Sequence, residues 1–292
     1  MSDTTKPTFS PTYTLGGDLT INRMGYGAMR ITGEGIWGPP QDHDESIRVL
    51  KRSVELGINF IDTADSYGPN VSEELIAEAL HPYRAGLVIG TKGGLLRTGP
   101  NQWPIDASPN HLREALEGSL TRLKLDQIDL YQLHRVDPEV PFEKTLEFLQ
   151  EVQEQGLVKH IGLSEVTVEQ IQKAQQYVKV ASVQNMYSVD NRKWEAELNY
   201  TAQNGMAFIP WYPLSGGNQE ALSKLDQIGQ KYGATKQQIA LSWLLHRSPN
   251  ILLIPGTSKV KHLEENVQAA SIALSAEDLA ELESLSPAPA AH

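Results

Sequence analysis

Short apolar runs alternate with amphipathic stretches along most of the chain. Runs of this length indicate buried strands, and the amphipathic stretches have the period of about 3.6 residues that is typical of helices covering a sheet. The predicted strands span residues 24–29, 58–62, 87–91, 128–134, 160–164, 181–184, 206–210 and 251–255. The predicted helices span residues 44–56, 72–80, 109–123, 142–154, 167–178, 192–204, 219–232, 235–246 and 259–270.

Residues at the boundaries of these stretches support the assignment. Pro109 follows Ser108 at a first helical position, and Thr167 stands where a helix N-cap is expected. Helices are expected to end just before the next strand at Gly57, Gly156 and Gly205.

The repeated strand–helix units predict one domain over residues 1–292, an α/β fold of the (β/α)8 or TIM barrel type with extra helices. Ahead of the first strand, residues 12–23 indicate a β-hairpin that would close one end of the barrel. A doubly wound Rossmann sheet is the alternative, but it requires a glycine-rich turn after the first strand. Gly25 and Gly27 lie within that strand, so the barrel is favoured.

Composition narrows the class of protein. The chain has no cysteine, which excludes disulfides, thiolate catalysis and cysteine-ligated metals. Its net charge of −11 repels nucleic acid and anionic membranes, so neither is expected as a partner, and an anionic ligand needs a local cluster of donors. The polar N-terminal segment 1–13 does not resemble a secretory signal, and no run approaches the roughly 18 apolar residues of a membrane span. We therefore expect a cytoplasmic protein with a flexible tail at 286–292.

Ionisable residues gather after three consecutive predicted strands. Asp62 and Tyr67 follow the second strand, Lys92 follows the third, and His134 ends the fourth. In a barrel the carboxyl ends of the strands carry the chemistry, so we expect these four side chains to share one site. Each residue alone has an ordinary structural explanation, but their grouping favours a functional one.

The four groups together predict a proton donor. The phenol of Tyr67, with an ordinary pKa of about 10, can donate a proton, and a nearby cation lowers that pKa. We expect Lys92 to supply the cation and Asp62 to hold Lys92 by an ion pair. His134 would orient a carbonyl group or share the proton.

The chain resembles the aldo-keto reductase family over nearly its whole length. The resemblance rests on seven segments in the family's order: GINFIDTADSYG (57–68), IGTKGG (89–94), DLYQLHR (129–135), GLVKHIGLSE (156–165), VQNMYS (183–188), WYPL (211–214) and IPGTSKVKHLEEN (254–266). It maps the family's catalytic residues onto Asp62, Tyr67, Lys92 and His134 without substitution. It implies a nicotinamide-dependent reductase of a small carbonyl substrate, in which hydride adds to the carbonyl carbon while Tyr67 protonates the oxygen. The implied cofactor is NADPH/NADP+, bound across the barrel mouth without a Rossmann fold.

The resemblance also implies where this cofactor binds. Ser164 and Gln184 match the residues that hold the nicotinamide carboxamide, and Trp211 matches the aromatic that stacks on nicotinamide. Glu165 departs from the family, in which asparagine is common at this position. A carboxylate cannot donate a hydrogen bond to the carboxamide oxygen as an asparagine amide can. The further implied cofactor residues are Tyr212, Leu214, Gly256, Thr257, Ser258, Lys259, His262, Glu265 and Asn266.

Residues 254–266 correspond to the family's phosphate and adenine site. A helix N-terminus there offers N–H groups to an anion, and residues 257–259 add hydroxyls and a cation for a 2′-phosphate. His262 stands where many members have arginine, and Gly256 replaces a lysine that is frequent in other branches. We therefore expect the chain to bind NADPH more tightly than NADH. The difference in affinity should be smaller than in members that have lysine at position 256 and arginine at position 262.

Two long loops predict the substrate pocket. They follow the first and third strands and carry Trp37 and Trp103, which with Trp211 suggest an aromatic-walled, open pocket for a flat or apolar carbonyl compound. Segments 25–40 and 247–266 resemble the bacterial branch of the family that includes pyridoxal reductases (pyridoxine 4-dehydrogenases). This resemblance makes pyridoxal a candidate substrate.

Two alternative functions are supported by fewer sequence features than the reductase. A cofactor-sensing regulatory subunit, like the potassium-channel β-subunits of the same family, can retain the four residues, but no segment indicates an extended surface for a partner. A metal-dependent hydrolase would need clustered ligands at the strand ends, and only Asp62 and His134 qualify.

Overall fold

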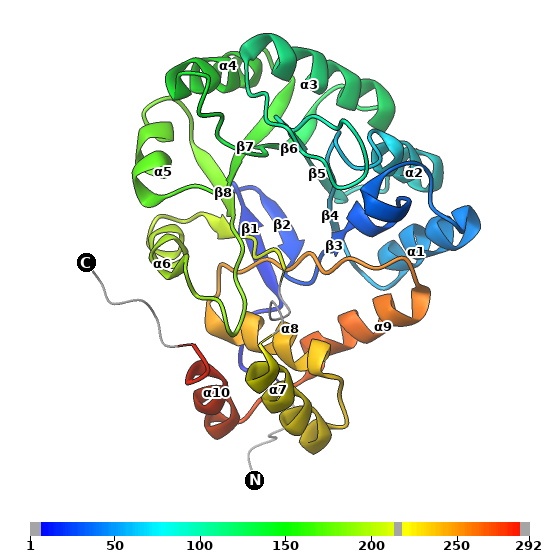
Figure 1. Cartoon of the computed structure of the whole chain (residues 1–292), viewed down its shortest axis with the longest axis vertical. Helices are drawn as coiled ribbons and strands as arrows, with labels where there is room; N and C mark the ends of the chain where they lie inside the picture. The colour runs from blue at the N-terminus through cyan, green and yellow to red at the C-terminus, as the bar shows by residue number, and fades with distance from the viewer. Residues whose placement is uncertain (1–6, 213–217, 287–292) are drawn as a thin grey trace.

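A curled parallel sheet forms the centre of the molecule, and helices surround it (Figure 1). The computed structural model describes residues 7–212 and 218–286. Neighbours in the main sheet are also neighbours in sequence, as a barrel requires. Its strands are β3 (Tyr26–Gly27), β4 (Phe60–Asp62), β5 (Val88–Gly93), β6 (Ile128–Leu133), β7 (Val158–Ser164), β8 (Val180–Gln184) and β9 (Ala207–Phe208).

The eighth predicted strand, 251–255, closes the barrel without a regular ladder. On one side the Gly25 N–H donates to the Leu253 carbonyl at 2.7 Å. On the other side the Leu252 N–H donates to the Phe208 carbonyl at 2.9 Å. The predicted (β/α)8 barrel is therefore confirmed, with an irregular last strand.

The helices follow the strands in the predicted alternation. They are α1 (His43–Glu55), α2 (Val71–Leu80), α3 (Pro109–Leu123), α4 (Phe142–Glu154), α5 (Val168–Ala174), α6 (Glu195–Gln203), α7 (Gln219–Tyr232), α8 (Lys236–Arg247), α9 (Val260–Gln268) and α10 (Ala276–Glu283). Thr167 caps α5 through a capping box with Gln170, and the Ser108 side chain caps α3. Helix α10 was not predicted, and α5 ends earlier than predicted. None of the helices within the described ranges is long and apolar enough to span a membrane.

Alternation along the strands divides the barrel interior into an apolar layer and a polar layer. In β4, Phe60 and Asp62 face inward, whereas Ile61 packs outward against the helices. The hairpin of β1 (Thr12–Leu15) and β2 (Leu19–Asn22) joins the apolar layer and closes the barrel at the amino-terminal ends of its strands, as predicted. The buried apolar layer comprises Leu15, Ile21, Phe60, Val88, Leu130, Ala181, Ala207, Ile209 and Leu252. The polar layer is therefore left at the carboxyl ends.

A buried arginine holds the irregular closure together. Arg23 is 1% exposed, and its guanidinium donates to the carbonyls of Ile251 at 2.8 Å, Leu245 at 3.0 Å and Ser248 at 2.6 Å. Burial lowers the pKa of Arg23 to about 10, which still leaves it charged at neutral pH. One side chain thus binds the end of α8 to the closing strand.

We expect Arg23→Met to lower the free energy of unfolding by about 3 kcal/mol or more, because several buried carbonyls lose their donor. Urea unfolding followed by circular dichroism measures this change. Arg84→Met, at an exposed arginine, serves as the control and should leave stability within about 0.5 kcal/mol of the wild type. A similarly small loss for Arg23→Met would contradict this role.

Candidate active site

Lys92 lies at the centre of the polar layer and is wholly removed from solvent. Its ammonium donates to Asp62 Oδ2 at 2.6 Å, to the Tyr67 hydroxyl at 3.1 Å and to the Thr63 carbonyl at 3.0 Å. An ammonium has three hydrogens, so each of them has a partner. The structure thus brings three of the four predicted residues into direct contact.

The other oxygen of Asp62 is also occupied. Oδ1 accepts from Gln132 Nε2 at 2.9 Å and from Gln184 Nε2 at 3.1 Å, and Gln184 Nε2 also lies 2.9 Å from Gln132 Oε1. Gly162 on the next strand leaves space for this network, because a Cβ there would lie 2.9 Å from Gln132 Cγ. Asp62 is therefore held as a carboxylate that accepts on both oxygens.

Burial and neighbouring charges act in opposite directions on the pKa values of Tyr67 and Lys92. Burial raises the pKa of Tyr67, and the positive charge of Lys92 lowers it, as expected, but offsets the burial only in part. Burial by itself would lower the pKa of Lys92, but Asp62 and Tyr67 together outweigh it and raise that pKa. At neutral pH the phenol therefore keeps its proton and the amine keeps its charge.

His134 faces Tyr67 edge to face, with ring centroids 6.0 Å apart. Burial, together with the charges of Lys92 and Arg135, holds the pKa of His134 well below its ordinary value. A neutral imidazole can donate a hydrogen bond through one nitrogen, but it carries no extra proton to share. Of its two predicted roles, this favours the orientation of a carbonyl oxygen.

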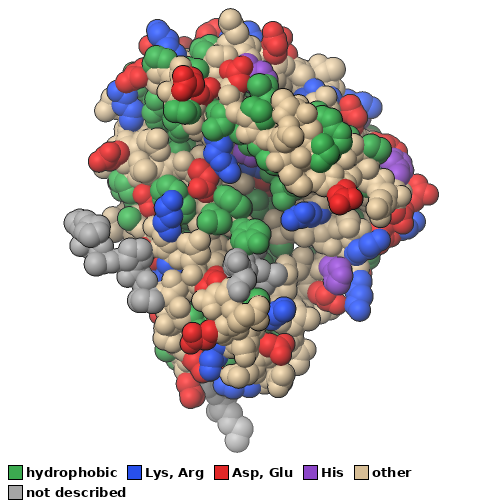
Figure 2. Space-filling model, viewed as in Figure 1, with side chains coloured by type: hydrophobic (Ala, Val, Ile, Leu, Met, Phe, Trp, Pro, Cys, Tyr) green, Lys and Arg blue, Asp and Glu red, His purple; other side chains and the backbone are tan. Residues whose placement is uncertain are grey.

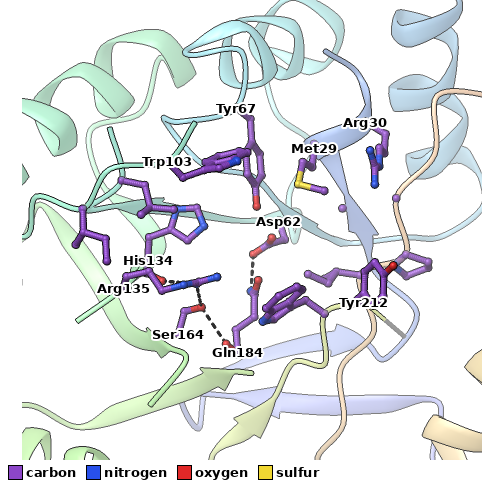
Figure 3. Close-up of a pocket in the computed structure, with 18 of the residues that line it drawn as sticks. Met29, Arg30, Asp62, Tyr67, Trp103, His134, Arg135, Ser164, Gln184 and Tyr212 are labelled. Atoms are coloured by element: carbon purple, nitrogen blue, oxygen red, sulfur yellow. Dashed lines mark hydrogen bonds between the residues drawn. The ribbon is translucent and has the colours of Figure 1, made fainter. Parts of the chain in front are cut away.

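A cavity of about 620 Å³ opens above these groups. Figure 2 shows its mouth as a hollow near the centre of the face, and Figure 3 shows side chains from several strands converging on it. The predicted residues on its wall are Asp62, Tyr67, Trp103, His134, Ser164, Gln184, Trp211, Tyr212 and Gly256. The sequence did not predict Met29, Arg30, Leu95, Ile105, Arg135 and Gln237 there, although most of them follow strand ends.

The two tryptophans of the long loops have different positions. Trp103 lines the cavity edge-on to Tyr67, with ring centroids 6.4 Å apart. Contrary to the prediction, Trp37 lies outside the described wall of the cavity and is 38% exposed. Arg97 explains the arrangement: its guanidinium lies 3.7 Å from the Trp103 ring centroid and donates to the Ile36 carbonyl at 2.6 Å, which joins the two loops.

The residues predicted for the nicotinamide ring meet at the floor of the cavity. The Ser164 hydroxyl donates to the Gln184 carbonyl at 2.9 Å. Gln184 has its amide nitrogen turned toward Asp62, which leaves its amide oxygen as an acceptor on the cavity wall. Glu165 accepts from Trp211 Nε1 at 2.7 Å and from the Met186 N–H at 2.6 Å. The departure at residue 165 therefore positions the Trp211 ring.

The residues predicted for the phosphates lie at the start of α9. The Thr257 hydroxyl accepts from the Lys259 N–H at 3.1 Å and so shapes the turn into the helix. The first helical N–H, that of Val260, donates to Glu45 at 3.1 Å, so one of the expected anion-binding groups already has a carboxylate partner. Ser258 lies between Thr257 and Lys259 in this turn.

The remaining predicted cofactor residues follow on α9 or precede α7. His262 Nδ1 lies 3.1 Å from Glu265 Oε2, and Asn266 is buried. Leu214 and the tail 287–292 lie outside the described residues. No cluster of three or more histidine, aspartate or glutamate side chains suited to a metal occurs in the described part of the chain.

Comparisons of the sequence and of the structure with known proteins point to the same family. Residues 23–287 match the sequence model of the family described as "Aldo/keto reductase family". The chain is 55% identical to an uncharacterised oxidoreductase of Schizosaccharomyces pombe over 271 residues, 91% of this chain and 87% of the relative. It is 44% identical to pyridoxine 4-dehydrogenase of Escherichia coli over 283 residues, 95% of this chain and 99% of the relative. The crystal structure of an aldo/keto reductase from Klebsiella pneumoniae in complex with NADP and acetate superposes with a TM-score of 0.82 at 26% identity, covering 97% of each chain.

Asp65 is a buried acidic residue outside the lining of the cavity, and it was not predicted. Burial and the nearby Glu73 raise the pKa of Asp65 to about 8. Glu73 is fully buried and accepts from Arg122 Nε at 2.7 Å, whereas Asp65 Oδ1 has no hydrogen-bond partner within the described chain. Asp65 is therefore protonated at neutral pH in the folded protein.

This raised pKa predicts a pH-dependent loss of stability. In the unfolded chain Asp65 ionises near pH 4, at about its ordinary pKa. Its favourable contribution is therefore complete below that pH and is lost as the pH rises through about 8, with a slope of up to about 1.4 kcal/mol per pH unit. We expect Asp65→Asn to flatten the decline of the unfolding free energy between roughly pH 5 and 8, as measured by urea unfolding. Asp126→Asn, at an exposed site, should follow the wild type, and parallel curves for Asp65→Asn and the wild type would refute the shift.

Proposed function

The chain belongs to the aldo/keto reductase family, and we propose that it reduces aldehydes and ketones to alcohols, with Tyr67 as proton donor. One observation carries the proposal. The Tyr67 hydroxyl lies on the cavity wall, within 3.1 Å of a buried ammonium whose charge is fixed by Asp62. Such a phenol can deliver its proton into the cavity while its conjugate base stays next to a cation.

We assign NADPH as the cofactor. Gln184 and Ser164 suit its carboxamide group, the Trp211 face suits its nicotinamide ring, and Arg30 and Lys259 suit its phosphates. The NADP of the Klebsiella pneumoniae structure supports this assignment. When bound, NADPH supplies the hydride that adds to the carbonyl carbon.

Residues of the chain orient and protonate the carbonyl oxygen of the substrate. His134, which is neutral, donates a hydrogen bond to this oxygen and aims it at Tyr67. As the oxygen gains negative charge, the Tyr67 O–H bond breaks and the proton moves to it, giving the alcohol. The phenolate left on Tyr67 is stabilised by the positive charge of Lys92, and the ion pair with Asp62 keeps Lys92 protonated. A proton from water restores the phenol.

The cavity wall favours a flat substrate. Trp103, Met29, Leu95, Ile105 and Tyr212 give it an apolar and aromatic surface beside Tyr67. The relationship to pyridoxine 4-dehydrogenase of Escherichia coli supports pyridoxal as a candidate within this class.

Replacement of the phenol tests the assignment. We expect Tyr67→Phe to lower kcat at least about 100-fold across a panel of aldehydes that includes pyridoxal, because general acid catalysis is removed. NADPH oxidation, followed by the loss of its absorbance, measures the rate, and fluorescence titration should show nearly unchanged NADPH affinity. The control Tyr200→Phe removes an exposed hydroxyl that donates to Gln175, away from the cavity, and should behave like the wild type. A Tyr67→Phe enzyme as active as the wild type would refute the role of Tyr67 as proton donor. Very slow turnover of every carbonyl compound by the wild type would instead favour a regulatory subunit.

The protonation states predict a flat pH profile. The pKa of His134 lies well below its ordinary value and that of Tyr67 lies above its ordinary value, so neither group titrates between roughly pH 6.5 and 9.5. We expect kcat for a neutral aldehyde to change less than about three-fold over that range. The profile is measured at constant ionic strength with saturating NADPH. A limb in this range that disappears in His134→Gln would show that His134 titrates there after all.

A further inference from the structure

Arg135 is a cation on the cavity wall that forms no ion pair with a carboxylate among the described residues. Its guanidinium donates through Nη1 to the His134 carbonyl at 2.6 Å and to the Ser164 hydroxyl at 3.0 Å. It also lies 5.7 Å from the centroid of the Trp211 ring. These contacts hold the group at the base of the cavity, where Figure 3 shows it reaching in beside His134.

The remaining donors of Arg135 are available to a ligand. Nε and Nη2 make no hydrogen bond to any part of the chain that the structure describes. The negative charge of Glu165 acts on Arg135, but no ion pair forms between them, and Glu165 binds Trp211 and Met186 instead. Burial lowers the pKa of Arg135, as expected of a cation withdrawn from water without a partner.

Arg135 is partly buried, and a charge partly withdrawn from water and without an opposite charge is stabilised when a ligand compensates it. The guanidinium shares the cavity wall with Tyr67 and His134, and its charge acts on both groups. The chain as a whole carries a net charge of −11, so an anionic substrate would need such a local cation.

We propose that Arg135 selects carbonyl substrates that carry an anionic oxygen, either a carboxylate or an ionised hydroxyl, on the aromatic ring that bears the aldehyde. This inference rests on the proposed reductase function and names its substrate class. Pyridoxal belongs to the class, because it carries an ionisable hydroxyl beside its aldehyde group.

Pairs of substrates that differ in charge but hardly in shape test the proposal. The 3- and 4-carboxybenzaldehydes are compared with the corresponding carbamoylbenzaldehydes, with NADPH saturating. For at least one ring position the wild type should prefer the carboxylate roughly 10- to 100-fold in kcat/KM, mainly through KM, because a charged hydrogen bond is added. Because the cofactor is common to both members of a pair, its binding cancels in the ratio.

Variants of Arg135 assign the preference to this residue. Arg135→Gln should reduce the ratio to near one whatever its effect on the absolute rates, and Arg135→Lys should restore part of the ratio. Arg84→Gln removes the same charge from an exposed site and should leave the ratio unchanged. Equal rates on both members of every pair in the wild type, or a preference that survives in Arg135→Gln, would overturn the proposal.

A binding experiment separates this inference from the reductase function. Benzoate and benzamide are titrated into the wild-type complex with NADP+ by calorimetry. Tighter binding of benzoate that is lost in Arg135→Gln supports anion recognition even if no carbonyl is reduced, an outcome that would refute the proposed function alone. Equal binding of the two ligands would refute anion recognition whatever the enzyme reduces.

Discussion

The buried ion pair between Lys92 and Asp62 is the interaction on which the rest of the site depends. An ammonium without access to water is stable only if every hydrogen finds an acceptor and an opposite charge lies nearby. Lys92 meets both conditions through Asp62, Thr63 and Tyr67. Its third hydrogen bond therefore brings a fixed positive charge to the Tyr67 hydroxyl. Removal of either member of the pair would leave the other as an uncompensated buried charge.

The barrel supplies the conditions for this pair. Its interior is sealed on one side by the hairpin and by the apolar layer around Phe60, so the polar layer can be satisfied only by its own members and by the cavity. Gln132 and Gln184 complete the coordination of Asp62, and the glycine at 162 gives them room. The loops above the strands contribute the walls, and Arg97 fixes the two longest against each other. Rigid strands thus place the charges, and loops determine which carbonyl compounds can approach them.

Much of this arrangement follows from local sequence patterns. The position of Lys92 after an apolar run, and its spacing from the runs that precede Asp62 and His134, were sufficient to predict that these residues share a site. Gln132 could also have been predicted, because it lies two residues before His134 and therefore on the same face of the strand. Helix α10 could also have been predicted, because Ser275 stands at its N-cap position and apolar residues follow it at helical spacing.

Other features depend on contacts between distant parts of the chain. The net pKa of Tyr67 follows from its burial, which no local pattern reports. The irregular closing strand depends on Arg23, more than 200 residues away in sequence from the carbonyls of Leu245, Ser248 and Ile251. Trp37 was assigned to the pocket because it lies in a long loop, but its orientation is set by the packing of that loop around Arg97.

The central claim is that Lys92 acts through Tyr67, and a double-mutant cycle on the hydride-transfer step tests it most directly. Single-turnover rates of NADPH oxidation with one aldehyde are measured for the wild type, Tyr67→Phe, Lys92→Met and the double variant. If Lys92 serves only to support the phenol, the double variant should be about as slow as Tyr67→Phe alone. If the losses instead multiply, Lys92 contributes independently of Tyr67, and the claim that it acts through the phenol is contradicted.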